Sequence, residues 1–393
     1  MLNETARRMS PAQPETLASL VQTRRVLIAV GAGGVGKTTT AAALGLAAAK
    51  RGKRVLVLTI DPARRLAESL GIGAMSSEAV TIDKARFAAI DYPLLGSLTA
   101  MMLDTKRTFD DLVIKHSSTK EKARKLLDNK LYQYVSTSLA GTQEYMAMEK
   151  LVAVKNDPQW DLIVLDTPPT ANALDFLDAP ERLMQALDSA TMKWFIEAFQ
   201  SSGKLSLNLL ARSAAMVLRG IGKITGGGFL EAMAELITEL NDLFGGFKHR
   251  AAQVQKALRT PEVAFVLVTS PSPMSIREVL YFSERLAEHS MARGAFVVNR
   301  FRTKPMRAGE TIPRADIDAA IASHGITLED DAATRLTKAH SDAESLAALD
   351  ARNVRALASS EGVPITRIRE LASDVHDLKH LSQLAEMLMS GGI

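Results

Sequence analysis

The sequence predicts an α/β protein with a mostly parallel sheet flanked by helices. Short apolar runs rich in valine, leucine and isoleucine alternate with segments of helical character, an order typical of a parallel sheet with crossover helices. Apolar residues occupy consecutive positions in these runs, which indicates strands buried on both faces. Five strands are predicted in this way, at residues 24–30, 53–60, 160–166, 263–270 and 294–300.

The intervals between the strands are predicted to be helical. The alanine-rich stretch TTAAALGLAAAKRG predicts a helix that closes at Gly52. Another helix is expected from about Ser275 to Arg293, between the last two strands. Residues 94–158 and 180–258 have helical, partly charged patterns and are expected to form helical insertions that make a subdomain within the same chain.

The ends of the chain complete the predicted organisation. Residues 1–24 are expected to be a polar arm, and residues 303–360 have the pattern of charged surface helices. Residues 25–393 are therefore expected to form a single domain.

The composition excludes several classes of function. The 393 residues include 47% apolar residues, enough for a large core, and the formal net charge is only +4. No clustered basic stripe is evident, so nucleic-acid binding is not expected. The chain has no cysteine, which excludes disulfides and thiolate metal sites. Neither a signal-peptide core nor a run of about 18 apolar residues is present, so we expect a cytoplasmic protein without an integral membrane segment.

The stretch from Gly31 to Thr38 reads GAGGVGKT and matches the pattern G-x-x-x-x-G-K-[ST], with a predicted strand before it and a helix after it. Glycines let the backbone wrap around phosphates, while N–H groups and the helix N-terminus favour anionic oxygens. We expect Lys37 to reach the β- and γ-phosphates and the Thr38 hydroxyl to ligate Mg²⁺. The predicted phosphate-binding residues are Gly33, Gly34, Val35, Gly36, Lys37, Thr38 and Thr39. The sequence therefore predicts a P-loop NTPase.

Two aspartates follow buried strands at the predicted nucleotide edge. Asp61 closes VLVLTID and Asp166 closes LIVLD, and ligands of parallel sheets bind beyond the carboxyl ends of strands. Asp166 fits the role of holding Mg²⁺ through its water shell, and Asp61 could orient the attacking water. A simple helix N-cap is the alternative for each, and it weighs more for Asp61.

Four motifs together resemble the arsenical-pump ATPase family, which includes the ATPases that guide tail-anchored membrane proteins. They are GGVGKTTTAAALG, LTIDPARRLAESLG, LDTPPTANALDFLDAP and FVVNRF, and VPITRIREL extends the resemblance towards the C-terminus. The resemblance implies ATP hydrolysis with Mg²⁺ by a dimer that holds nucleotides at its interface. It implies that Asp61 positions water in a first switch, that Asp166–Thr170 form a second switch, that Asn299 recognises adenine, and that the loop near Pro364 covers the base.

This chain departs from the family pattern at a position that bears on ATP hydrolysis. The family usually has a lysine where this chain has Ala32, and that lysine reaches the partner's phosphates across the dimer. Three interpretations stay open: slow hydrolysis, replacement of the charge by Arg64 or Arg65, or a heterodimer with a lysine-bearing relative. For the two arginines a solvated helical turn is the plain alternative. A weakly active or regulatory subunit therefore remains a candidate.

Other departures bear on two possible functions, which are the binding of a client and the energy supply of an anion pump. Asn172 replaces a histidine of the targeting members, and the cysteines that hold zinc in eukaryotic members are absent. Arsenite-responsive relatives bind the metalloid through cysteines, which disfavours an anion pump. Residues 180–258 carry apolar residues at helical spacing, which fits either ordinary core or a groove for a hydrophobic helix or membrane-protein client. The resemblance favours the groove, and both interpretations stay open.

Overall fold

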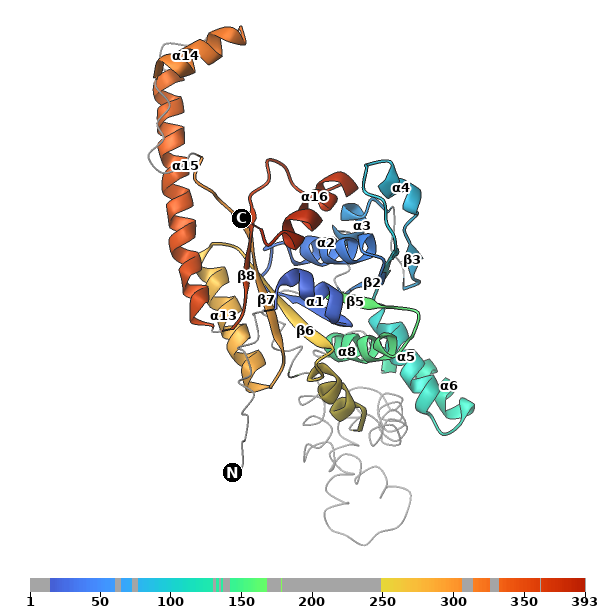
Figure 1. Ribbon diagram of the computed structural model, residues 1–393. Helices are drawn as coiled ribbons and strands as arrows, with labels where there is room; N and C mark the ends of the chain where they lie inside the picture. Colours follow the sequence, from blue (N-terminus) through green and yellow to red (C-terminus); the bar gives the residue numbers. More distant parts are fainter. Residues whose placement is uncertain are drawn as a thin grey trace, which may run out of the picture.

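The computed structural model describes residues 15–60, 65–72, 77–129, 132–133, 136, 142–167, 178, 249–305, 314–325, 332–360 and 362–392. The strands among them are β1 (Val26–Val30), β2 (Arg54–Thr59), β3 (Val80–Thr81), β4 (Ser97–Met102), β5 (Leu162–Asp166), β6 (Val263–Thr269), β7 (Arg293–Phe301) and β8 (Ile365–Arg369). They form an eight-stranded sheet in the order β3-β4-β2-β5-β1-β6-β7-β8 (Figure 1). Neighbouring strands are parallel except β3 and β4, so the predicted α/β class is confirmed.

Helices lie on both faces of the sheet (Figure 1). In the described part of the chain they are α1 (Leu17–Thr23), α2 (Lys37–Lys50), α3 (Arg65–Ser69), α4 (Lys84–Ala88), α5 (Thr105–His116), α6 (Lys120–Asp128), α8 (Thr142–Lys155), α13 (Pro273–Glu288), α14 (Arg314–Ser323), α15 (Ala332–Val354), the 3₁₀ helix η1 (Arg355–Ser359) and α16 (Leu378–Met389). Residues 249–258 are also helical. None of these described helices is long and apolar enough to cross a membrane.

The alternation of side chains along each strand divides the interior into two cores. In β1, Leu27 and Ala29 belong to the core that α2 and α16 cover. Val26, Ile28 and Val30 belong to the opposite core, under α8 and α13. The same division continues through β2, β5, β6 and β7. Because both faces are covered, each of these strands contains a continuous run of apolar residues, which is why the sequence reveals them.

All five predicted strands are confirmed, but the sheet contains three more. β4 lies inside residues 94–158, where a helical pattern was expected, so that prediction is wrong for this segment. Its sequence SLTAMM is rich in helix-forming residues. Pairing with β2 on one side and β3 on the other, with Leu98 and Ala100 buried, overrides that local preference. The other described residues of that interval are mostly helical, in α5, α6 and α8.

The N-terminal segment differs from the polar arm predicted for residues 1–24. Residues 17–23 form α1, and Thr16 caps it by accepting a hydrogen bond from Ser19 N. Leu17, Leu20 and Val21 are buried in the core shared with α2 and α16. Their i, i+3, i+4 spacing is typical of an amphipathic helix. The helix is so short that this pattern does not stand out from the polar residues around it.

The helices predicted within residues 303–360 are confirmed as α14 and α15. α15 has 23 residues, and Figure 1 shows it extending past the sheet with α14 at its far end. Its last turns are anchored through buried Ala347, Asp350 and Val354, and Ala332 at its start is buried as well. Of the interval 180–258, residues 180–248 lie outside the described residues, so the proposed client groove stays a prediction.

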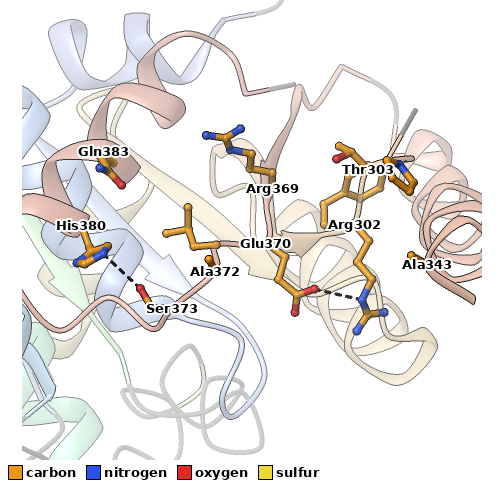
Figure 2. Close-up of a pocket in the computed structure, with 12 residues that line it drawn as sticks. Arg302, Thr303, Ala343, Arg369, Glu370, Ala372, Ser373, His380 and Gln383 are labelled. Carbon is orange, nitrogen blue, oxygen red and sulfur yellow. Dashed lines mark hydrogen bonds and ion pairs between the residues drawn. The ribbon is translucent and has the colours of Figure 1, made fainter. Parts of the chain in front are cut away.

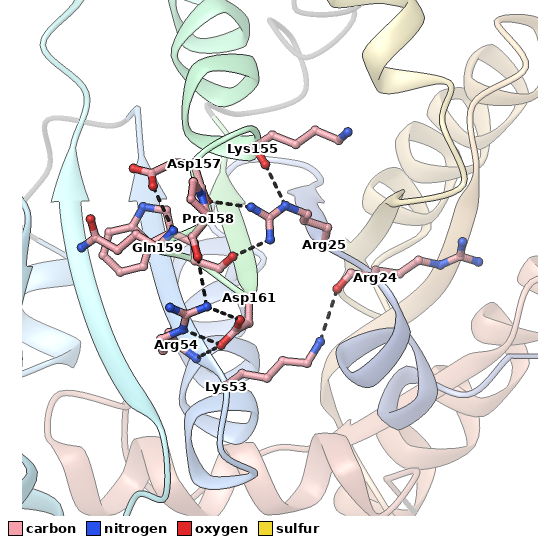
Figure 3. A network of polar contacts seen from close by, with 10 residues as sticks. Arg24, Arg25, Lys53, Arg54, Lys155, Asp157, Pro158, Gln159 and Asp161 are labelled. Carbon is pink, nitrogen blue, oxygen red and sulfur yellow. Dashed lines mark hydrogen bonds and ion pairs between the residues drawn. The ribbon is translucent and has the colours of Figure 1, made fainter.

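Polar contacts tie three strands together at the amino edge of the sheet (Figure 3). The Arg25 guanidinium, next to β1, donates to the carbonyls of Lys155 and Asp157, both at 2.7 Å, and to that of Trp160. One cation thereby satisfies three carbonyls of the turn between α8 and β5. We expect this contact to fix the start of β5 beside β1.

The second contact of this edge joins β2 to β5. Arg54 holds Asp161 through Nε–Oδ2 (2.9 Å) and Nη2–Oδ1 (2.7 Å), and its backbone N–H donates to Oδ2 at 2.9 Å. These hydrogen bonds from Arg54 lower the pKa of the Asp161 carboxyl to about 2. The carboxylate therefore stays charged at any pH near neutrality.

The contacts of Arg25 lead to a prediction about stability. Arg25→Met removes three charge-assisted hydrogen bonds and should lower the free energy of unfolding by about 2–3 kcal/mol. Denaturant unfolding of the full chain measures this value. The control is Arg124→Gln, which removes an arginine that is 86% exposed and should change stability by less than about 0.5 kcal/mol. Equal stability of the two variants would contradict the anchoring role of Arg25.

Candidate functional site

The loop between β1 and α2 lies at the carboxyl edge of the sheet, and its neighbours require two of its glycines. A Cβ at Gly31 would lie 2.0 Å from Val268 O of β6. Gly36 has φ of 94°, and a Cβ there would lie 2.3 Å from Asn299 Nδ2. Both distances are shorter than any real contact, and a positive φ is unfavourable for other residues. The loop can therefore keep this path only with glycine at both positions.

The lysine of the motif points back into the loop. Lys37 begins α2, is only 7% exposed, and donates from Nζ to the carbonyl of Ala32 at 2.8 Å. The Ala32 side chain is also 7% exposed and packs in the core on the α2 side. The ammonium is thus held inside the curve of the loop, at the start of a helix whose dipole also favours anions.

A buried carboxylate lies on one side of the loop. Asp166 ends β5, where it is paired in register with Ala29 of β1 and with Thr59 of β2. It is fully buried, and Thr59 Oγ1 donates to its Oδ2 at 3.0 Å. Thr167 follows and donates from Oγ1 to Ala29 O at 2.8 Å. These contacts fix an anionic group at the carboxyl edge, one strand away from the loop.

An amide side chain supports the loop from its other side. Asn299 of β7 donates from Nδ2 to Val35 O at 2.9 Å, and its Oδ1 accepts from Arg300 N at 3.0 Å. The pairing of β7 with β8 shifts between Val298 and Phe301, so Asn299 and Arg300 lie in an irregularity of the ladder. Bulges of this kind redirect side chains near binding sites. Here the irregularity aims Asn299 at the loop.

A cavity of about 430 Å³ opens over the loop, a size typical of small-ligand sites. The groups that line it come from the loop, α3, the end of β5, the end of β7 and the segment after β8. They are Gly34, Gly36, Lys37, Thr38, Thr39, Glu68, Ser69, Thr167, Arg300, Asp374, Val375 and His376. This cavity therefore combines residues of the loop with side chains from other parts of the chain that lie far apart in the sequence.

A second cavity, of about 640 Å³, lies at the ends of β7 and β8 (Figure 2). Arg302 faces Glu370 across it, with Nε–Oε2 at 3.2 Å, and Ser373 lies 3.2 Å from His380 Nε2. No residue of the phosphate loop lines this larger cavity. Of these two cavities, the one over the loop is therefore the one that the loop residues line.

The structure brings most of the predicted site residues together. Lys37, Thr38 and Thr39 line the loop cavity with Gly34 and Gly36. Gly33 is an exposed residue of the same loop, whereas Val35 is buried and offers its carbonyl to Asn299. Asp166 lies at the same edge. Asp61, Arg64, Thr170, Asn172 and the side chain of Arg65 lie outside the described residues, so their roles stay predictions.

Pro364 is not brought to the loop. It precedes β8 at the amino end of that strand, and its carbonyl accepts from Phe296 N at 2.8 Å. The segment that reaches the loop cavity is instead residues 374–376, which follow β8. The reason is the direction of β8: the strand is parallel to β7, so only its carboxyl end meets the nucleotide edge.

Sequence reasoning missed several groups of the site. Thr59, Thr167 and Arg300 lie inside the quoted stretches LTIDPARRLAESLG, LDTPPTANALDFLDAP and FVVNRF, and Thr167 belongs to the predicted second switch. No role was predicted for their individual side chains, although their position at the ends of strands is a usable signal. The segment 374–376 could not be placed because β8 was not predicted. Burial alternates along β8, with Thr366 and Ile368 buried, as is typical of an edge strand. Over only five residues this alternation is a weak sequence signal.

The fold and the loop together define a P-loop nucleotide-binding protein of the α/β class. The family model described as anion-transporting ATPase (ArsA ATPase) matches residues 24–307. The chain therefore belongs to the ArsA ATPase family.

Curated relatives agree with this assignment. The chain is 25% identical to ATPase GET3 of Malassezia globosa over 305 residues, which are 77% of this chain and 80% of that protein. It is 27% identical to ATPase get3 of Aspergillus terreus over 289 residues, 72% of this chain and 76% of that protein. The matches thus extend over most of each protein, and both relatives bear the name ATPase.

The contact of Asn299 with the loop leads to a prediction. Asn299→Ala removes the donor to Val35 O and should lower the free energy of unfolding by about 1–2 kcal/mol, even without nucleotide. Thermal or denaturant unfolding of the ligand-free chain measures this. Lys304→Ala, at an exposed position of the following segment, is the control and should be neutral within about 0.5 kcal/mol. If Asn299→Ala is equally neutral, Asn299 has no supporting role.

Proposed function

We propose that this chain binds Mg-ATP at the loop between β1 and α2 and hydrolyses it. The observation that carries the proposal is a buried lysine inside a glycine loop, with a buried carboxylate fixed one strand away. Lys37 and Asp166 are the groups involved. Membership of the ArsA ATPase family supports the same reading.

The residues at this edge fit a magnesium ion. Mg²⁺ prefers oxygen ligands and is usually held by one or two protein groups together with the phosphates. The Thr38 hydroxyl and the Asp166 carboxylate supply such oxygens, with Asp166 acting through water. In the described part of the chain no cluster of three or more His, Cys, Asp or Glu is arranged for a metal. When bound, Mg²⁺ neutralises charge on the β- and γ-phosphates.

The order of the strands supports one orientation of the nucleotide. β1 carries the loop, β5 with Asp166 lies on one side, and β6 followed by β7 with Asn299 lies on the other. The metal and the terminal phosphate would therefore lie towards β5, and the nucleoside towards β7. Recognition of adenine by Asn299 is part of this proposal, in addition to its contact with Val35. Asp61 is proposed to position the attacking water.

We further propose that the ATPase works as a dimer whose nucleotide state is coupled to an apolar or membrane-protein client. This part rests on the resemblance to the targeting ATPases and on the relatives named ATPase GET3. Transport of a thiophilic anion is disfavoured because the chain has no cysteine.

A second candidate is a weakly active or regulatory subunit completed by a lysine-bearing relative. Ala32 favours it, because a methyl group that is 7% exposed cannot bring a cation to a partner's phosphates. A cation supplied across an interface can contribute about 10³–10⁵ in rate. Its loss would leave hydrolysis slow unless Arg64 or Arg65 replaces it.

Steady-state ATP turnover of the purified chain tests the proposal. Turnover above background should fall to background in Lys37→Ala, because the phosphates lose their only cation from the motif. Magnesium removal by a chelator should have the same effect. Turnover that survives Lys37→Ala would contradict the site. A folded chain that binds ATP and does not turn it over would favour the second candidate.

A further inference from the structure

Arg300, in the stretch FVVNRF, is a cation beside the phosphate loop for which the sequence predicts no role of its own. It lines the loop cavity together with Lys37 and Thr39. It also lines a smaller adjoining cavity of about 110 Å³, with Gly36 and Asn299. Two cavities at the loop thus share Arg300, from the end of β7, as a lining residue.

The backbone at this residue is held in an unusual conformation. Arg300 has φ of 58°, in the left-handed region that residues other than glycine seldom adopt. Such a conformation persists only where the surroundings fix it, and it is frequent at binding sites. Two features accompany this conformation. Asn299 Oδ1 accepts a hydrogen bond from Arg300 N at 3.0 Å, and the pairing between β7 and β8 is irregular at this point.

The guanidinium is loosely held by its neighbour. Arg300 Nη2 lies 3.9 Å from Asp374 Oδ1, and the two side chains are 55% and 93% exposed. An exposed pair at this distance contributes little to stability. A phosphate, which accepts the fork of an arginine through two oxygens, is a stronger partner. The site therefore offers a cation that can change partners when a phosphate arrives.

The place of Arg300 in the sheet decides which phosphate it can meet. Asp166, the metal-side carboxylate, ends β5, whereas Arg300 is on β7, on the other side of β1. In loops of this type the backbone holds the α- and β-phosphates, and the lysine reaches the β- and γ-phosphates. Arg300 approaches from the side opposite the metal, next to Thr39, and so faces the inner phosphates.

We propose that Arg300 binds the α- and β-phosphates of the nucleotide from the nucleoside side, exchanging Asp374 for the ligand. This inference rests on the proposed Mg-ATP binding. ATP and ADP share these phosphates, so Arg300 strengthens the binding of both and leaves the chemical step unchanged. It does not replace the γ-phosphate cation that Ala32 lacks.

Titration calorimetry of the full chain with Mg-ATP and with Mg-ADP tests this. Arg300→Gln should weaken both ligands about tenfold, the loss expected for one charge-assisted contact, and keep their affinity ratio. Arg302→Gln is the matched control, because it removes the same charge two residues away. Arg302 is engaged by Asp350 and Glu370 and does not line the loop cavity. Its variant should bind both nucleotides as the wild type does.

Arg300→Lys provides a second variant that keeps the charge and loses the two-pronged fork, and it should weaken both nucleotides by less than Arg300→Gln does. Three results would overturn the proposal. Arg300→Gln could bind like Arg302→Gln, it could lose affinity for ATP alone, or the lysine variant could lose as much as the glutamine variant. If the wild type itself binds neither nucleotide, the proposed function fails instead, whatever Arg300 does.

Discussion

The phosphate loop depends on two contacts from neighbouring strands. Gly31 lies so close to the Val268 carbonyl that no side chain fits between them, and Asn299 donates to the Val35 carbonyl at 2.9 Å. Between these contacts the backbone follows a path that turns Lys37 inward onto Ala32. The loop is therefore preorganised by β6 and β7, and the helix α2 begins at a fixed place.

The carboxyl edge of the sheet has two halves, one on each side of the phosphate loop. Towards β5 and β2, Asp166 and Thr59 form a buried polar pair, beside which we propose that the metal binds. Towards β7, the ladder irregularity brings Asn299 under the loop and Arg300 beside it. A nucleotide that follows this division has its terminal phosphate on the acidic side and its nucleoside on the basic side. A Mg²⁺ ion held by Asp166 would offset the repulsion between that carboxylate and the terminal phosphate, so the proposed direction depends on the metal.

The sequence predicts the centre of this protein well and its margins poorly. Strands buried on both faces, such as β1 and β6, are continuous apolar runs, and the loop motif has residues that its chemistry requires. β4 and β8 were missed because pairing decides their state, while their residues favour helix or alternate weakly. The prediction of the site was incomplete for the same reason. Without β8, the segment 374–376 had no position, and the irregularity that directs Arg300 has no signature in VVNRF.

The most direct measurement is a crystal structure of the full chain with Mg²⁺ and a non-hydrolysable ATP analogue. The account predicts that the phosphates lie over residues 33–39, with the metal beside Thr38 and Asp166. It predicts the nucleoside near Asn299, with residues 374–376 along its side. A nucleotide in the reverse direction, or one seated in the larger cavity at the ends of β7 and β8, would contradict the division of the edge on which the proposals depend.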